Sequence, residues 1–156
     1  MKEKPSPLTF TYDSQKNEWA TGPPLLTARS NHSSCAIKSE DGATQGIIVI
    51  GGKGYCKDYP LISTEILRTT EQKWTQGPDL PMGIAEASCI ELPSSMNYVC
   101  LIIGGTTTSS ISLASMTIHF NNPSSLVYGL DKSLSTWIPL GKISERSGGL
   151  LALAFS

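Results

Sequence analysis

Short segments with the hydrophobic pattern of β-strands run along the whole chain. Some alternate apolar and polar residues, whereas 47–50 is a continuous branched apolar run, which is typical of a strand buried on both faces. Nowhere does an apolar stripe of helical period persist for three turns. Turn sequences such as Gly22-Pro23-Pro24 separate the segments. The pattern predicts an all-β chain with strands at 8–12, 18–21, 33–37, 47–50, 64–69, 73–76, 85–92, 98–103, 126–130, 136–140 and 150–155.

One hydrophobic sequence motif recurs at a long interval. A branched apolar run ends in Gly51-Gly52, and a second one ends in Gly104-Gly105, 53 residues later. Three tryptophans interleave with these runs. A period near 50 residues is typical of a repeat protein, in which each unit buries its apolar face only by stacking on its neighbours. Many short strands with this period favour a propeller over a β-sandwich. The tryptophans are Trp19, Trp74 and Trp137.

The residues around the tryptophans resemble the kelch repeat family. An aromatic or apolar residue and an acid, Tyr12-Asp13, precede Trp19, and Leu130-Asp131 precedes Trp137 at the same distances, whereas the middle unit has Leu67-Arg68 in this place. A glycine follows each tryptophan, and an arginine follows in the first and third units. The resemblance covers the chain from Leu8 to its end, except for an insertion at 106–124. The arginines are Arg29 and Arg146.

The resemblance implies a partial kelch-type β-propeller, with about two complete four-stranded blades plus incomplete flanking blade strands. Residues 1–7 form an N-terminal tail ahead of a kelch repeat region at 8–156. The units lie near 8–28, 29–80 and 81–142, and 143–156 starts another blade. Because known propellers have four to eight blades, we expect a missing part of the ring, supplied by a longer protein or by a homodimer.

The repeated residues have structural roles. We expect the diglycines to adopt positive φ and to let strands crowd together, and the tryptophans to pack between blades with their ring nitrogens bonded. The diglycines do not open a helical pattern, so they are not phosphate loops. The chain has four cysteines, Cys35, Cys56, Cys89 and Cys100. Cys35 and Cys89 lie in apolar, strand-like sequence at equivalent repeat positions, and we expect them to act as small hydrophobic residues. The alternative is an oxidising compartment with Cys56 and Cys100 joined.

Composition narrows the function. Twelve basic and thirteen acidic residues leave a net charge of −1, which gives no field to attract nucleic acid or anionic lipid. No run reaches membrane-spanning length, and no signal-peptide stretch follows the first residues, so we expect a cytoplasmic protein. His32 and His119 are the two histidines, and no nucleophile, paired-carboxylate or metal motif accompanies them. We therefore expect no enzyme activity, cofactor or metal.

Two long loops are candidate partner-binding sites. The loop 52–63 mixes aromatic and charged residues, and the insertion 106–124 has the alternation of an extended hairpin, where the apolar residues either lengthen strands or contact a partner. We expect a non-catalytic protein-interaction scaffold. The resemblance implies substrate recognition for a ubiquitin-ligase adaptor or actin binding; the alternatives are an extracellular module binding carbohydrate or cell-surface protein and, less favoured, a galactose-oxidase-like copper enzyme. The candidate residues are Lys53, Tyr55, Lys57, Asp58, Tyr59, Ile111, Met116 and His119.

Overall fold

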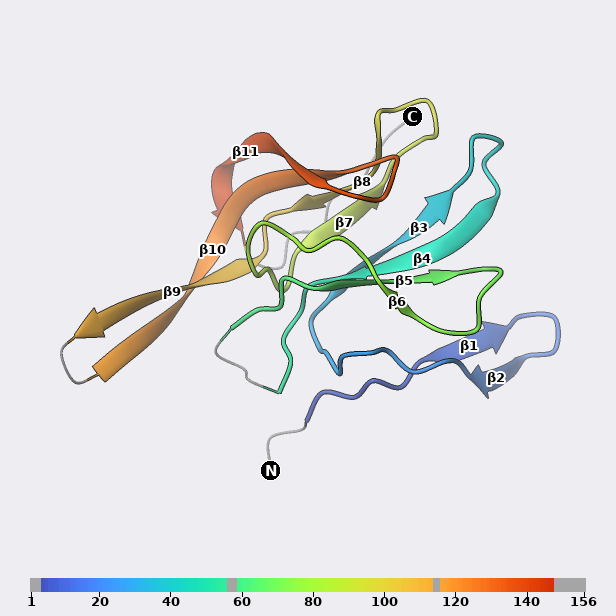
Figure 1. The fold of residues 1–156 in the computed structure, drawn as a ribbon, viewed down its shortest axis with the longest axis horizontal. Helices are drawn as coiled ribbons and strands as arrows, with labels where there is room; N and C mark the ends of the chain where they lie inside the picture. The colour runs from blue at the N-terminus through green and yellow to red at the C-terminus, as the bar shows by residue number, and fades with distance from the viewer. Residues whose placement is uncertain (1–3, 56–58, 114–115, 148–156) are drawn as a thin grey trace.

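The computed structural model describes residues 4–55, 59–113 and 116–147. Within these ranges every regular element is a β-strand and none is a helix, which confirms the all-β prediction. Figure 1 shows their arrangement. The strands are β1 (Phe10–Asp13), β2 (Glu18–Thr21), β3 (Ser33–Lys38), β4 (Thr44–Ile50), β5 (Thr64–Arg68), β6 (Thr75–Gln76), β7 (Ser88–Glu91), β8 (Tyr98–Ile103), β9 (Thr106–Leu113), β10 (Met116–Asp131) and β11 (Trp137–Ser147).

Two antiparallel sheets form the body of the molecule. The first has the order β3-β4-β5-β6, so each strand pairs with its neighbour in sequence. The second has the order β7-β8-β10-β11, and β9 pairs with the outer half of β10 as a long hairpin that projects from this sheet (Figure 1). β1 and β2 form a separate two-stranded sheet. The hairpin confirms the extended form predicted for the insertion.

The main core lies between the two large sheets. Ile48 and Ile50 of β4 are at most 1% exposed, and so are Cys100 and Ile102 of β8. The first strands of the two sheets, β3 and β7, lie next to each other. Burial of one such aliphatic side chain contributes about 1.5–3 kcal/mol. This packing joins two successive segments of the chain, one sheet against the next.

The packing between successive segments repeats. On the opposite face of the first sheet, a smaller cluster joins the loop after β2 to that sheet through Leu25, Val49, Leu67 and Trp74. The residues at the corresponding places one segment later all belong to the main core, and they are Leu80, Ile102, Leu130 and Trp137. The same four positions therefore build both contacts.

Hydrogen bonds repeat in the same way. The indole nitrogen of Trp74 donates to the carbonyl of Pro23 at 2.9 Å, and that of Trp137 donates to the carbonyl of Pro78 at 3.1 Å. The hydroxyls of Thr9 and Thr64 donate to these same two carbonyls, at 2.8 and 2.9 Å. Trp74 and Trp137 are therefore buried with their ring nitrogens bonded, as predicted, at the contacts between successive segments.

The third tryptophan differs from the prediction. Trp19 is 70% exposed and contacts the ring of Tyr12, its partner across β1 and β2, with the two rings tilted at 42° and their centroids 5.0 Å apart. The burial predicted for Trp19 is wrong because the described residues place no earlier segment against β1 and β2. Ile47, predicted to be buried with the rest of its run, is 43% exposed. Its side chain lies on the face of the first sheet opposite the main core, which Ile48 and Ile50 enter.

Backbone geometry explains the repeated glycines. All four diglycine residues have positive φ, between 61° and 94°, as predicted. A Cβ on Gly51 would lie 2.2 Å from the carbonyl oxygen of Ile84, so this place also requires the absence of a side chain. Glu86 has φ 58°, which ends the extended backbone there, and β7 begins only at Ser88 instead of at 85.

The end of the described chain also differs from the prediction. β11 continues past Leu140 to Ser147, and Ser147 pairs with Ser124 of β10. Residues 143–147, predicted to start another blade, therefore extend this strand, and Arg146 lies within it. The rest of that predicted segment, 148–156 with its strand at 150–155, lies outside the described residues.

Candidate functional site

A buried ion pair holds the connection between β2 and β3. Arg29 lies within this connection, and its side chain is fully buried. Its guanidinium donates to the carbonyls of Thr27 (3.4 Å), Gly51 (2.7 Å) and Ser63 (2.9 Å), to the Ser63 hydroxyl (3.1 Å) and to the Glu65 carboxylate (2.6 Å). A guanidinium has five N–H donors. All of them are therefore used inside the protein, so Arg29 is structural and is not available to a ligand.

Glu65 completes this network from β5. Its carboxylate also accepts hydrogen bonds from the backbone nitrogens of Leu26 at 2.6 Å and Thr27 at 2.9 Å. A buried charge is tolerated when it is paired and hydrogen-bonded in this way. The sequence did not indicate Glu65, because a single acid within a strand usually faces solvent. The signal that could have found it is the unexplained repeat arginine, which needs a partner.

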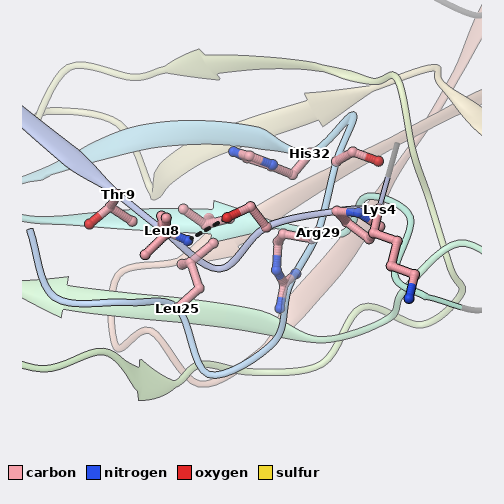
Figure 2. Close-up of a pocket in the computed structure, with 10 residues that line it drawn as sticks. Lys4, Leu8, Thr9, Leu25, Arg29 and His32 are labelled. Atoms are coloured by element: carbon pink, nitrogen blue, oxygen red, sulfur yellow. Dashed lines mark hydrogen bonds between the residues drawn. The ribbon is translucent and has the colours of Figure 1, made fainter. Parts of the chain in front are cut away.

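A pocket of about 540 Å³ lies beside this network (Figure 2). Apolar side chains of Leu8, Leu25 and Val49 form part of its wall, and Lys4 and His32 contribute polar groups. The N-terminal segment crosses one side of the pocket, and the residues before β3 form the other. Val49 is the residue of β4 that reaches this pocket.

His32 supplies the titratable group of this pocket. Much of the residue is exposed, yet the ring lies against enough protein that burial lowers its pKa below 6.5; Arg29 lowers the pKa further, and Glu65 opposes the shift. His32 is therefore neutral at pH 7 and can accept or donate a hydrogen bond. Among the described residues that line this pocket there is no carboxylate or thiol beside His32.

Three cysteine sulfurs meet in the main core. Cys35 of β3 and Cys89 of β7 form a disulfide, and Cys100 is a buried free thiol. The three sulfurs all lie within 4.8 Å of one another. Burial raises the pKa of Cys100 to about 12, and Glu91 adds to the shift, so this thiol is protonated at neutral pH. Two of the three sulfurs are bonded to each other, and the third carries its proton, so the cluster is not poised to ligate a metal.

The disulfide corrects two expectations from the sequence. Cys35 and Cys89 are not merely small hydrophobes. They occupy equivalent places in two strands that lie side by side, so their sulfurs meet across the boundary between the sheets. The alternative pairing of Cys56 with Cys100 is also wrong for Cys100, which is free, and Cys56 lies outside the described residues.

The first candidate loop braces the sheets. The Lys53 ammonium lies 2.9 Å from the Glu86 carboxylate, which also accepts from the Asn31 amide at 2.9 Å. These two hydrogen bonds, from Lys53 first and then Asn31, lower the pKa of Glu86. Lys53 therefore joins the loop to the second sheet. Tyr55 and Tyr59 are exposed, as a contact role requires, whereas Lys57 and Asp58 lie outside the described residues.

The second candidate loop is the β9–β10 hairpin. In its register Ile111 pairs with Ile118, Met116 with Leu113 and His119 with Ser110. The long pairing shows that these residues lengthen two strands. The pocket lined by Thr107, Ser109 and Asn122 of the hairpin includes none of the first loop's described residues.

The acids at the two equivalent repeat positions, Asp13 and Asp131, bind backbone nitrogens in turns, as the resemblance implies. Asp13 accepts from the backbone nitrogens of Gln15 and Lys16, and these bonds lower its pKa. Asp131 accepts from the nitrogens of Ser135 at 2.9 Å and Thr136 at 2.8 Å. Desolvation opposes ionisation of Asp131, but its hydrogen bonds outweigh it, so the pKa is again lowered.

Two apolar faces remain uncovered at the ends of the array. The two-stranded sheet presents Phe10, Tyr12 and Trp19, which are 59%, 46% and 70% exposed. At the other end, Ile138 and Leu140 of β11 are 36% and 41% exposed. Because side chains two apart on a strand share a face, each set forms one surface. The sequence did not single out either surface as a candidate binding site.

Comparison with models of known protein families finds no match for this chain. No curated protein matches it either. Among the described residues, no helix has the length and apolar character that crossing a membrane needs.

Proposed function

We propose that this chain is a kelch-type partial propeller that serves as a non-catalytic protein-interaction scaffold. Two features support the interpretation as part of a propeller. Each large sheet is a four-stranded antiparallel path apart from the inserted hairpin, and the same four positions and the same tryptophan-to-proline hydrogen bond join each segment to the one before. A stack of this kind leaves an apolar face at each end.

The aromatic face of the two-stranded sheet carries the proposal of protein binding. Tyr12 and Trp19 occupy the places that Leu67 and Trp74 occupy one segment later, where both pack against Leu25. Exposed aromatic residues clustered on a rigid sheet are typical of binding surfaces, because they bury large areas at small entropic cost. We assign the binding of a protein partner to the face formed by Phe10, Tyr12 and Trp19.

The disulfide supports an oxidising setting over the cytosol. Disulfides such as Cys35–Cys89 persist in secreted or extracellular proteins and are rare where glutathione keeps thiols reduced. This observation favours the extracellular alternative, a module that recognises a cell-surface protein, over a ubiquitin-ligase adaptor or an actin-binding protein.

The test uses the chain coupled to a resin and exposed to a cell-surface protein extract. A partner should bind wild-type chain and the Tyr55→Ala variant, but should be reduced at least about tenfold by Trp19→Ala, because a central aromatic contact contributes about 2 kcal/mol or more. Isothermal titration with the purified partner should give the same order of affinities. If every captured protein binds the Trp19→Ala variant as well as wild type, the aromatic face is not the binding site.

A further inference from the structure

The contact between successive segments has two different sides. The leading side is a tryptophan and an apolar residue on the strand that pairs beside it, as in Trp74 with Leu67. The trailing side is the loop of the preceding segment, with Leu25 and the carbonyl of Pro23. Trp137 and Leu130 meet Leu80 and Pro78 in the same way, as described above. Each junction is thus heterologous, with one kind of surface meeting another.

The first segment shows an unused leading side. Trp19 and Tyr12 take the places of Trp74 and Leu67, with Phe10 beside them on the same face of β1. Both large aromatic side chains are exposed, although their equivalents one segment later are buried or half-buried. What this side lacks is the apolar surface of a preceding segment.

The second sheet shows an unused trailing side. Leu101 and Ile103 stand three and one residues before a diglycine, as Ile48 and Ile50 do in the first sheet. The second sheet covers Ile48 and Ile50 almost completely, whereas Leu101 and Ile103 are only partly buried. Their register partners on β10 and β11 continue the same outer face. It consists of Ile90, Leu101, Ile103, Val127, Ile138 and Leu140.

This outer face is ordered and apolar. Gly129 lies in register between Leu101 and Ile138, and a Cβ on Gly129 would lie 2.8 Å from the Tyr98 ring and 3.0 Å from Leu140. The ring and the leucine therefore close over the glycine on this side of the sheet. The side chains around Gly129 are therefore packed together, and the face offers an apolar surface to a partner.

We propose that a second copy of this chain binds head to tail, with the Phe10, Tyr12 and Trp19 face of one copy on the outer face of β8, β10 and β11 of the other. This inference rests on the proposed function and names the partner of its aromatic face. The argument is continuity: the aromatic face repeats the side that meets a preceding segment twice inside the chain, and the outer face repeats the Ile48 and Ile50 face that meets the second sheet. A heterologous contact of this kind continues into a ring when its rotation closes.

Two variants test the direction of the contact. Trp19→Glu blocks only the leading side, and Leu140→Glu blocks only the trailing side. Because both residues are exposed in the single chain, both variants should keep the wild-type strand content by circular dichroism, whereas loss of the oligomer lowers the melting temperature. Light scattering behind a sizing column should give an oligomer for wild type and for the control Met96→Glu, at an exposed residue outside both faces, and a 16.7 kDa monomer for each variant alone. An equimolar mixture of the two variants should restore one junction and give a species of two chains.

Other results would overturn the head-to-tail contact. A wild-type monomer at the same concentration, an oligomer that neither variant dissociates, or variants that do not complement each other would each exclude it. A wild-type monomer combined with a different protein that still binds through Trp19 would exclude self-association and leave the proposed function standing. If the chain self-associates but no different protein binds through Trp19, the function of this face is restricted to assembly.

Discussion

At the scale of single residues, the buried pair of Arg29 and Glu65 fixes the path of the chain between the two-stranded sheet and the first large sheet. Glu65 binds two backbone nitrogens of that connection as well as the guanidinium. Arg29 lies in the connection before β3 and Glu65 lies on β5, so the pair joins two parts of the chain that are distant in sequence. Its loss should therefore loosen a junction between segments and not only one side chain.

We predict that Glu65→Gln lowers the free energy of unfolding by about 3–5 kcal/mol, because it leaves the Arg29 charge buried and unpaired. The matched control is Glu91→Gln, whose ion pair with Lys38 is partly exposed and should be worth less than about 1 kcal/mol. Urea denaturation measures both values. Similar losses for the two variants would show that burial of the Arg29 pair has no special weight.

The sequence predicted half of this network. Arg29 stood out because it recurs as Arg146, but nothing in the text around Glu65 separates it from an ordinary surface acid. A charged residue inside a strand is buried only when a partner from elsewhere in the chain neutralises it. That partner lies 36 residues away, so the pairing depends on the fold.

At the scale of elements, the tryptophans test how segments join. We predict that Trp74→Phe and Trp137→Phe each lower the free energy of unfolding by about 1–3 kcal/mol, because each leaves a proline carbonyl without its indole donor. Trp19→Phe, on an exposed face, should change it by less than about 0.5 kcal/mol. Thermal or urea unfolding compares the three. Equal effects at all three positions would contradict a shared role for only two of them.

The strands themselves were largely predictable, because alternation, apolar runs and turn residues are local signals. The long β9–β10 hairpin was predictable from the alternation of apolar and polar residues in its sequence. The limits of β7 did not, since Glu86 adopts a left-handed backbone that no residue preference indicates. The exposure of Trp19 did not either, because burial depends on a neighbouring segment and not on the tryptophan's own surroundings in sequence.

At the scale of the whole molecule, the disulfide joins the two large sheets. We predict two reactive thiols out of four cysteines when the chain is unfolded without reductant, and four after reduction. Adding reductant should lower the stability of wild type by about 2–5 kcal/mol, whereas the Cys35→Ala variant should not respond to it. The Cys100→Ala variant should respond as wild type does. Four thiols without reductant would show that the bond does not form.

The spacing of the cysteines indicated equivalent repeat positions but not their pairing. Equivalent residues of successive units meet only where the strands that carry them lie side by side. Here they meet because both lie on the first strand of their sheet, and these first strands are neighbours. Pairing thus depended on the order of the strands in three dimensions, which the sequence alone did not supply.

The Cys35–Cys89 bond also decides how the molecule would respond to mechanical force. A load applied at the two ends of the chain passes through the covalent link and bypasses the 54-residue stretch that it closes. Extended chain spans about 3.3–3.6 Å per residue, so roughly 180 Å of contour stays out of reach of the pulling force. The first large sheet and the loop after it would therefore keep their length while the hairpin of β1 and β2 and the strands after Cys89 are drawn out.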